Sequence, residues 1–437
     1  MIRTKKNLFM ILICMLLLGI VVIYSYNASR SETLEIGVFV GSNWNVANAN
    51  SYTIMDKAIE HFESQNPDIK VHYYSGIPKE DYSEWLTGKM MIGKMPDVFM
   101  VLEDDFNKLA SMGELKDLST LMSRDTGFSK SAYYQTVLDT GTYYGKQYAL
   151  PYEAVPNLMF VNKTLLQKEG ITVPDNDWTW DDLYSICTKV TKDTNHDGIL
   201  DQYGLYNYHW TEAVYANGAS LFDKDGRQSF FTDERVEEAI KFVMKIEGVN
   251  KGNKVTQEDF DNGNVAFMPL PFSEYRTYKT YPYRIKKYTN FQWDCITLPS
   301  GSEGNNTSEI NTLLIGISAN TKKEAAAWAF LKTLTFDQDI QMDVFRYSQG
   351  ASVLKSVTQS KEAEEILQQD MEESEKVIDM ILLNRVLEEG IIVPKFQNYT
   401  EAMAVAENDI NQMIEGEKSI ESSLKILQRS MKRYLAQ

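Results

Sequence analysis

Residues 33–74 read TLEIGVFVGSNWNVANANSYTIMDKAIEHFESQNPDIKVHYY. Apolar and other residues alternate from Leu34 to Val38, which is typical of a strand with one buried face. Apolar residues then recur at helical spacing over 54–62, and residues 69–74 predict a second strand. A strand, a helix and a strand in this order predict a parallel βαβ unit, and therefore an α/β fold class.

The rest of the chain continues in the same mixed pattern. Short apolar runs predict strands at 97–101 and 158–161, and Thr179 is expected to cap a helix that acidic residues open. Amphipathic segments predict further helices at 237–246, at 322–334 and, as a pair broken near Gly416, in the last 37 residues. We find no internal repeat and no long Gly/Pro linker, so the domains are not expected to be separate units on a string.

Size, charge and cysteine content limit the class of protein. A chain of 437 residues suggests two or three domains. The 43% hydrophobic and 24% charged residues are ordinary for a globular protein and exclude a disordered, collagen-like or multi-span membrane chain. The net charge of -17 repels phosphate backbones and argues against nucleic-acid binding. The three cysteines include Cys14 in the N-terminal apolar run, which leaves no disulfide framework.

The first thirty residues predict a targeting segment. Arg3, Lys5 and Lys6 precede an uncharged apolar run from Leu8 to Ile23, the pattern of a signal peptide or a membrane anchor over residues 1–30. Small residues at the expected cleavage positions are poorly matched over 24–29, so we favour an uncleaved anchor over a cleaved signal. Cys14 lacks the context of a lipoprotein cysteine. In either case, residues from about 31 face the outside of the cell.

The sequence carries no motif for catalysis. None of the four histidines lies in a His-Glu-x-x-His pattern, and there is no nucleophile elbow, phosphate-binding P-loop or dinucleotide fingerprint. We therefore expect a protein that is not an enzyme. Carboxylates are so numerous that a glycosidase pair of acids stays open as an alternative.

Residues 193–201, DTNHDGILD, resemble most of an EF-hand-type calcium loop. A glycine occupies the sharp turn at the sixth position, and oxygen donors occur at the spacing that calcium requires. The bidentate acid at position twelve is missing, because Gly204 is there. The alternative is an Asx-rich turn without metal. The expected ligands of a structural calcium ion are Asp193, Asn195, Asp197, the carbonyl of Ile199, Asp201 and Gln202 or an acid from elsewhere.

Aromatic residues beside polar residues supply a second signal of binding. They occur at Trp44, at 152–153, at 209–212 and at 272–275. Aromatic faces stack on the apolar faces of sugar rings, while carboxylates and amides bond the sugar hydroxyls. Taken singly, each aromatic is explained as well by packing in the core or in a loop.

Several short motifs in order resemble the extracellular solute-binding proteins of family 1, the capture subunits of bacterial ABC sugar importers. The matching stretches cover most of residues 33–436. They are AIEHFESQNPDIKV at 58–71, MPDVF at 95–99, GELKDL at 113–118, GKQYALPY at 145–152, FVNK at 160–163, WDDL at 180–183, DGILDQYG at 197–204, GNVAFM at 263–268 and AAAWAFL at 325–331. Two departures are the missing lipobox cysteine and the absence of a proline after residues 348–350.

This resemblance implies a two-lobe fold of the periplasmic-binding-protein type, with a hinge and a cleft between the lobes. The first lobe would take residues 33–149 and 306–349, and the second would take 153–300 and 354–437. The resemblance places the solute site in the cleft, at Trp44, Glu103, Asp104, Tyr152, Glu153, Trp210, Glu212, Phe272, Glu274, Tyr275 and Tyr347. The acids among them favour a neutral or cationic solute over a phosphorylated one.

Three functions follow as hypotheses. The first is the capture of a carbohydrate, expected to be an oligosaccharide, by a monomer on the extracellular face of the cytoplasmic membrane, with delivery to an ABC permease. The second is a membrane-anchored solute sensor for a signalling partner, which an uncleaved anchor would favour. The third, which the missing catalytic motifs disfavour, is a secreted enzyme acting on glycans.

Overall fold

The computed structural model describes residues 32–44, 46, 48, 50–224, 226–279, 291–369, 378–394, 396 and 398–435. The predicted targeting segment at 1–30 lies outside the described residues. Within the described part of the chain, no helix is both long and apolar enough to cross a membrane.

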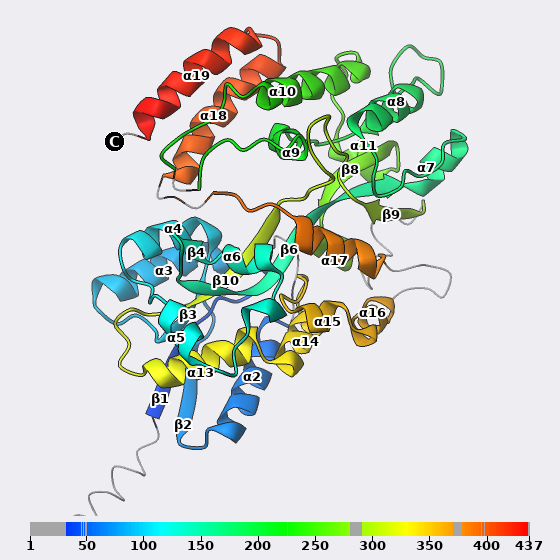
Figure 1. Cartoon of the computed structure of the whole chain (residues 1–437). Coiled ribbons are helices and arrows are strands. Elements are labelled where there is room, and N and C mark those ends of the chain that lie inside the picture. The colour runs from blue at the N-terminus through cyan, green and yellow to red at the C-terminus, as the bar shows by residue number, and fades with distance from the viewer. Residues whose placement is uncertain are drawn as a thin grey trace, which may run out of the picture.

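An eight-stranded sheet runs through the molecule in the order β2-β1-β3-β10-β6-β8-β7, with β9 also paired to β6 (Figure 1). Its strands are β1 (Glu32–Gly37), β2 (Ile69–Tyr74), β3 (Val98–Val101), β6 (Ala149–Asn162), β7 (Tyr203–Leu205), β8 (Val265–Pro271), β9 (Trp293–Ile296) and β10 (Ile310–Ile317). A separate hairpin joins β4 (Thr142–Tyr143) to β5 (Lys146–Gln147). Strands β1 and β2 pair in parallel across the helix α2 (Ser51–Gln65). The predicted βαβ unit is therefore confirmed.

The long strand β6 connects two lobes. Its first part, from Ala149 to Pro156, pairs with β10, and its second part, from Asn157 to Asn162, pairs with β8 and β9. Figure 1 shows the two bodies on either side of this crossing strand. The α/β two-lobe fold class is confirmed.

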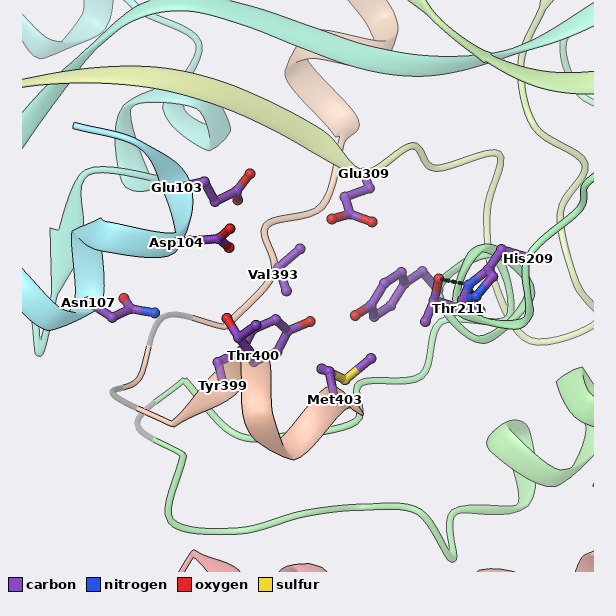
Figure 2. Close-up of a pocket in the computed structure, with 11 residues that line it drawn as sticks. Glu103, Asp104, Asn107, His209, Thr211, Glu309, Val393, Tyr399, Thr400 and Met403 are labelled. Atoms are coloured by element: carbon purple, nitrogen blue, oxygen red, sulfur yellow. Dashed lines mark hydrogen bonds between the residues drawn. The ribbon is translucent and has the colours of Figure 1, made fainter. Parts of the chain in front are cut away.

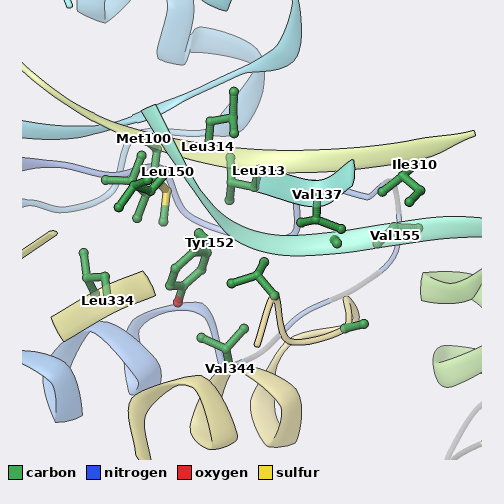
Figure 3. Packing of buried hydrophobic residues seen from close by; sticks show 14 of the residues in the cluster. Met100, Val137, Leu150, Tyr152, Val155, Ile310, Leu313, Leu314, Leu334 and Val344 are labelled. Carbon is green, nitrogen blue, oxygen red and sulfur yellow. The ribbon is translucent and has the colours of Figure 1, made fainter. Parts of the chain in front are cut away.

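Helices cover the sheet of the first lobe. They are α2, α3 (Lys79–Met91), α4 (Glu103–Ser111), α5 (Ser119–Arg124), α6 (Gln135–Asp139), α13 (Glu324–Thr335) and α14 (Gln338–Tyr347). α13 contacts α2, α14 and β10, and this layer buries the larger hydrophobic core. Figure 3 shows that core beside β6 and β10, with Tyr152, Leu334 and Val344 between the strands and the helices. The core continues along β6 through Phe160 into the second lobe.

The second lobe is built mainly from helices around β7, β8 and β9. These helices are α7 (Lys163–Lys168), α8 (Trp180–Val190), α9 (Trp210–Ala216), α10 (Glu234–Glu247), α11 (Gln257–Asp261), α12 (Phe272–Lys279), α18 (Tyr399–Ile414) and α19 (Ile420–Tyr434). Thr179 caps α8, as predicted, and the structure adds a capping box with Asp182. A second core joins α8, α9, α10, α18 and α19.

Three helices of the C-terminal part lie with the first lobe. α15 (Lys355–Thr358) and α16 (Lys361–Gln368) contact α14, and α17 (Met380–Glu389) contacts α6 and α15. α18 and α19 contact α10 of the second lobe. The expected assignment of the whole of 354–437 to the second lobe differs from this packing. Short amphipathic helices carry no sequence signal for the lobe that they cover.

Candidate functional site

A cavity of about 320 Å³ opens between the two lobes. The first lobe contributes α4, the second contributes α9 and α18, and the chain before β10 closes one side (Figure 2). Its lining combines carboxylates, hydroxyls and aromatic rings. The lining residues are Glu103, Asp104, Asn107, His209, Thr211, Tyr215, Glu309, Val393, Tyr399, Thr400 and Met403.

The strand β3 positions the acids of the first-lobe wall. All four residues of β3 are buried, and α4 begins two residues after its end. Glu103 and Asp104 therefore lie at the carboxyl end of a parallel strand and in the first turn of a helix, where the helix dipole stabilises negative charge. Both were predicted as site residues, and the structure brings both into this cavity.

The start of α9 forms the second-lobe wall. His209 caps α9, and the carboxylate of Glu212 accepts the backbone N–H of His209 at 2.8 Å. The hydroxyl of Thr211 lies 2.7 Å from His209 Nδ1, and His209 Nε2 lies 3.1 Å from a carboxylate oxygen of Glu407. A carboxylate only accepts, so Nε2 carries the proton and Nδ1 accepts from Thr211.

One hydrogen bond crosses the cleft beside the cavity. The side-chain Nδ2 of Asn107 on α4 donates to the backbone oxygen of Phe396, which precedes α18, at 3.0 Å. Among the described residues, the buried Oδ1 of Asn107 has no hydrogen-bond partner. The lobes therefore meet at this point, and one buried acceptor is left over.

The electrostatic environment of the cavity is negative. Burial raises the pKa of Glu212, and with the smaller effect of the charge of Glu309 the pKa reaches about 8. Burial also raises the pKa of Tyr399, and Tyr215, Glu309 and Glu103 act in the same direction. Figure 2 shows the carboxylates of Glu103, Asp104 and Glu309 turned toward one space. A negative potential of this kind attracts hydrogen-bond donors and cations.

A second polar cluster surrounds Glu153 on β6, between the lobes. The buried carboxylate of Glu153 accepts the indole N–H of Trp44 at 2.7 Å. Arg276 of α12 donates to the backbone oxygen of Gly350 at 2.9 Å. Burial raises the pKa of Glu153, while hydrogen bonds from Ser348 and Trp44 and the charge of Arg276 oppose that effect. This cluster unites two predicted site residues, Trp44 and Glu153, with one that the sequence did not indicate, Arg276.

The structure places the other predicted residues away from the cavity lining. Successive residues of a strand face opposite sides, so Tyr152 points into the first core while Glu153 points into the polar cluster. Trp210 is buried and donates its indole N–H to Glu407 at 2.7 Å. Tyr347 accepts from Lys57 at 3.3 Å.

The predicted residues of α12 lie at the lobe junction. Phe272 and Tyr275 are buried and stack with ring centroids 5.9 Å apart. The hydroxyl of Tyr275 accepts the backbone N–H of Ile378 at 2.6 Å, which ties α12 to the chain before α17. Glu274 stands on the same helix and is half-buried. These aromatics act in packing.

The loop 193–201 is folded around its own carboxylates. Asp193 accepts the backbone N–H groups of His196 and Gly198 at 2.7 Å each, and Asp201 accepts that of Thr194 at 2.8 Å. Asp197 in turn accepts the N–H of Ile199 at 2.8 Å.

The donor set of this loop fits a hard cation only in part. Asp193, Asn195, Asp197, Asp201 and the carbonyl of Ile199 would hold it, and calcium would supply structural cross-linking of the loop. Within the described residues, no group of three His, Cys, Asp or Glu side chains is placed to hold a metal ion.

The predicted sixth ligand, Gln202, points elsewhere. Its amide donates to Glu169 at 3.0 Å and to the backbone of Val190 at 2.8 Å, and its oxygen accepts from Lys168 at 3.3 Å. The calcium site stays a prediction.

Sequence reasoning missed most of the cavity lining. Asn107 lies one helical turn after two predicted acids, so the spacing on α4 could have indicated it. Tyr215 lies five residues beyond Trp210 on α9, a helix that was not predicted from the sequence. Glu309 and Tyr399 come from distant parts of the chain and carry no local signal.

Comparisons with known proteins agree with this geometry. The sequence model of a family described as "Bacterial extracellular solute-binding protein" matches residues 47–340. The diacetylchitobiose binding protein of Streptomyces coelicolor is 28% identical over 233 residues, which are 52% of this chain and 50% of the relative. The chain thus spans about half the length of that curated relative.

Solved structures share the fold over nearly the whole chain. An ABC substrate-binding protein from Listeria monocytogenes in complex with cycloalternan superposes with a TM-score of 0.69 at 19% identity, covering 93% of this chain and 99% of that one. The cyclic alpha-maltosyl-1,6-maltose binding protein from Arthrobacter globiformis gives a TM-score of 0.75 at 16% identity, covering 92% and 98%.

Proposed function

The chain belongs to the bacterial extracellular solute-binding proteins, and we propose that it captures a carbohydrate in the cleft between its lobes. The family and the solved neighbours are binding proteins, and the family places the chain on the extracellular side. The relatives named above bind diacetylchitobiose, cycloalternan or a cyclic maltose derivative, by their own descriptions. Their chemistry supports a carbohydrate as the solute of this chain.

One observation carries the proposal. The interlobe cavity has about 320 Å³ and takes its lining from both lobes. That size lies within the range of small-molecule sites, and it accommodates one or two sugar rings. Carboxylates on the first lobe can accept sugar hydroxyls, while Tyr215 and Tyr399 of the second lobe supply aromatic surface.

Closure of the two lobes over the solute links its capture to its delivery. The lobes are joined at β6, and Asn107 already bonds across the cleft to Phe396. A solute that contacts α4 and α18 together stabilises the closed state over the open one, because it gains contacts with both walls only there. The closed form would deliver the solute to an ABC import permease.

The proposal also covers turnover, membrane attachment and a structural metal ion. We expect binding without turnover, so that the solute is recovered unchanged. The basic and apolar segment at 1–30 supports anchoring of the chain at the membrane, where we expect it to act as a monomer. The carboxylate-rich loop 193–201, none of whose residues lines the cavity, would take calcium in a structural role.

Thermal unfolding of the chain with a panel of mono- and oligosaccharides tests capture. A ligand at 100 times its Kd adds about 2.7 kcal/mol to the folded state, which raises Tm by a few degrees. The double variant Glu103→Gln with Asp104→Asn should lose the shift. Glu364→Gln on α16, an exposed change that does not touch the cavity, should keep it. No saturable shift with any saccharide would refute the proposal.

A further inference from the structure

The balance of hydrogen-bond donors and acceptors in the cleft cavity limits the solute further. Glu103, Asp104 and Glu309 line the cavity and, as carboxylates, only accept hydrogen bonds. The buried Oδ1 of Asn107 adds a neutral acceptor that has no partner among the described residues. Each carboxylate has about four lone-pair positions, so one contact within the protein leaves it able to accept more.

The neutral donors of the lining are largely engaged with the protein itself. The Nδ2 of Asn107 donates to the backbone of Phe396, and the hydroxyl of Thr211 donates to His209. His209 Nε2 is turned to Glu407, and the hydroxyls of Tyr399 and Tyr215 bond each other. The lining that the structure describes includes no lysine or arginine.

One lysine that interacts electrostatically with this wall donates its hydrogen bond elsewhere. Lys79 of α3 is coupled electrostatically to Asp104, and its Nζ donates to the backbone oxygen of Asn43. Lys79 is not part of the cavity lining. The described lining therefore has more hydrogen-bond acceptors than donors, and it favours a solute that supplies hydrogen-bond donors.

Different solute groups meet this demand unequally. A hydroxyl brings one donor and two acceptor lone pairs, and an N-acetyl carbonyl brings acceptors that need a donor from the protein. A phosphate or carboxylate would add repulsion. A protonated primary amine brings three donors and no acceptor, and its charge pairs with the carboxylates.

We propose that the solute is an amino sugar whose protonated primary amine binds between Glu103, Asp104 and Glu309. The inference rests on the proposed function of this cleft and narrows it to a cationic saccharide. The amine would take the place of the donors that the wall lacks, and the sugar ring would lie toward Tyr399 and Tyr215. Asp104 is the most accessible of the acids on α4, so it is the residue to test.

Isothermal titration of the full chain with a matched pair of disaccharides tests the proposal. Diacetylchitobiose and its deacetylated form, chitobiose, differ in whether their two nitrogens are acylated or are free amines. At about pH 6 a free amine is largely protonated. We expect chitobiose to bind at least about tenfold more tightly, since hydrogen bonds between charged groups are about twice as strong as neutral ones.

Changes in ionic strength and a variant of Asp104 measure how much the charge of the amine contributes to binding. Raising the ionic strength to about 1 M shortens the screening length to about 3 Å and should reduce the preference for chitobiose several-fold. Asp104→Asn should reduce the preference in the same way, because it weakens the binding of chitobiose more than that of diacetylchitobiose. Glu364→Gln is the matched surface control. An unchanged Tm shows that each variant folds.

The outcomes separate this inference from capture itself. One contrary result is that diacetylchitobiose binds as tightly as chitobiose or more tightly, and another is that only neutral oligosaccharides bind. Either result would refute recognition of a protonated amine but would leave carbohydrate capture unaffected. Binding of a linear polyamine without any saccharide would overturn the sugar part of both proposals. Absence of binding by every saccharide would overturn capture and the amine together.

Discussion

Glu212 offers a test of the electrostatics of the cleft. Its pKa is raised from an ordinary value of 4.5 to about 8, first by burial and then by the charge of Glu309, against the hydrogen bond from the backbone of His209. Below about pH 4.5 the side chain is protonated in the folded and the unfolded chain alike. Between about pH 4.5 and pH 8 the unfolded chain loses the proton that the folded chain keeps. The stability contributed by Glu212 is therefore lost as the pH rises through this window.

The size of the effect follows from the two pKa values. Their difference, 8 minus 4.5, is about 3.5 pH units, or an upper limit of about 5 kcal/mol at 1.36 kcal/mol per unit. The residue is only half-buried, so solvent screens part of this charge, and we expect about 2 kcal/mol. The variant Glu212→Gln removes the titration and keeps an oxygen that can accept from His209 in the capping box.

Urea unfolding, followed by tryptophan fluorescence, measures the difference. At about pH 8.5, Glu212→Gln should be more stable than the parent chain by about 2 kcal/mol, and near pH 4.5 the two should agree. Glu364→Gln should follow the parent at both pH values. A loss of stability that is equal at every pH would mean that the capping contact dominates. An unchanged slope of stability against pH would refute the raised pKa.

Three further predictions concern the polar cluster around Glu153, the packing of Gly204 against α8 and the loop 193–201. Trp44→Phe removes the indole N–H that donates to Glu153, so we expect the free energy of unfolding to fall by about 1.5 to 3 kcal/mol. Denaturant unfolding measures this change, and an unchanged free energy would contradict the hydrogen bond. Gly204→Ala places a methyl group 2.5 Å from the Cα of Cys187 and should lower Tm by an amount equivalent to about 1 to 3 kcal/mol, whereas Gly88→Ala within α3, where nothing lies within 4 Å, should be neutral or slightly stabilising. Excess calcium should raise the Tm of the parent chain and have no effect on Asp193→Asn, and a calorimetric scan that shows no shift in the parent would exclude the calcium site.

The parts of the fold that depend on local pattern could be predicted from the sequence. The βαβ unit, the Thr179 cap and the pair of C-terminal helices each have a signal within one turn or one strand. Glu103 and Asp104 were indicated by the resemblance to the solute-binding family, and in the structure they follow a buried parallel strand, where ligand sites gather.

The parts that depend on distant packing could not be predicted. Tyr152 and Glu153 look alike as binding residues, but strand alternation sends one into the core, and only the pairing partners of β6 decide which one. Tyr399 reaches the cavity because α18 returns to the second lobe after α17 has packed on the first. No hydrophobic periodicity in the sequence predicts that α18 packs on the second lobe.

The position of β10 has a consequence for folding kinetics. This strand lies between β3 and β6 in the sheet but follows them by more than 140 residues in the chain. The central hydrogen bonds of the first lobe therefore cannot form until residues 310–317 are available. Sheets completed by such distant partners fold slowly, because the loop must close before its contacts form. During synthesis, the first two hundred residues would lack the strand that joins β3 to β6. They would therefore stay unfolded and accessible to export machinery or chaperones.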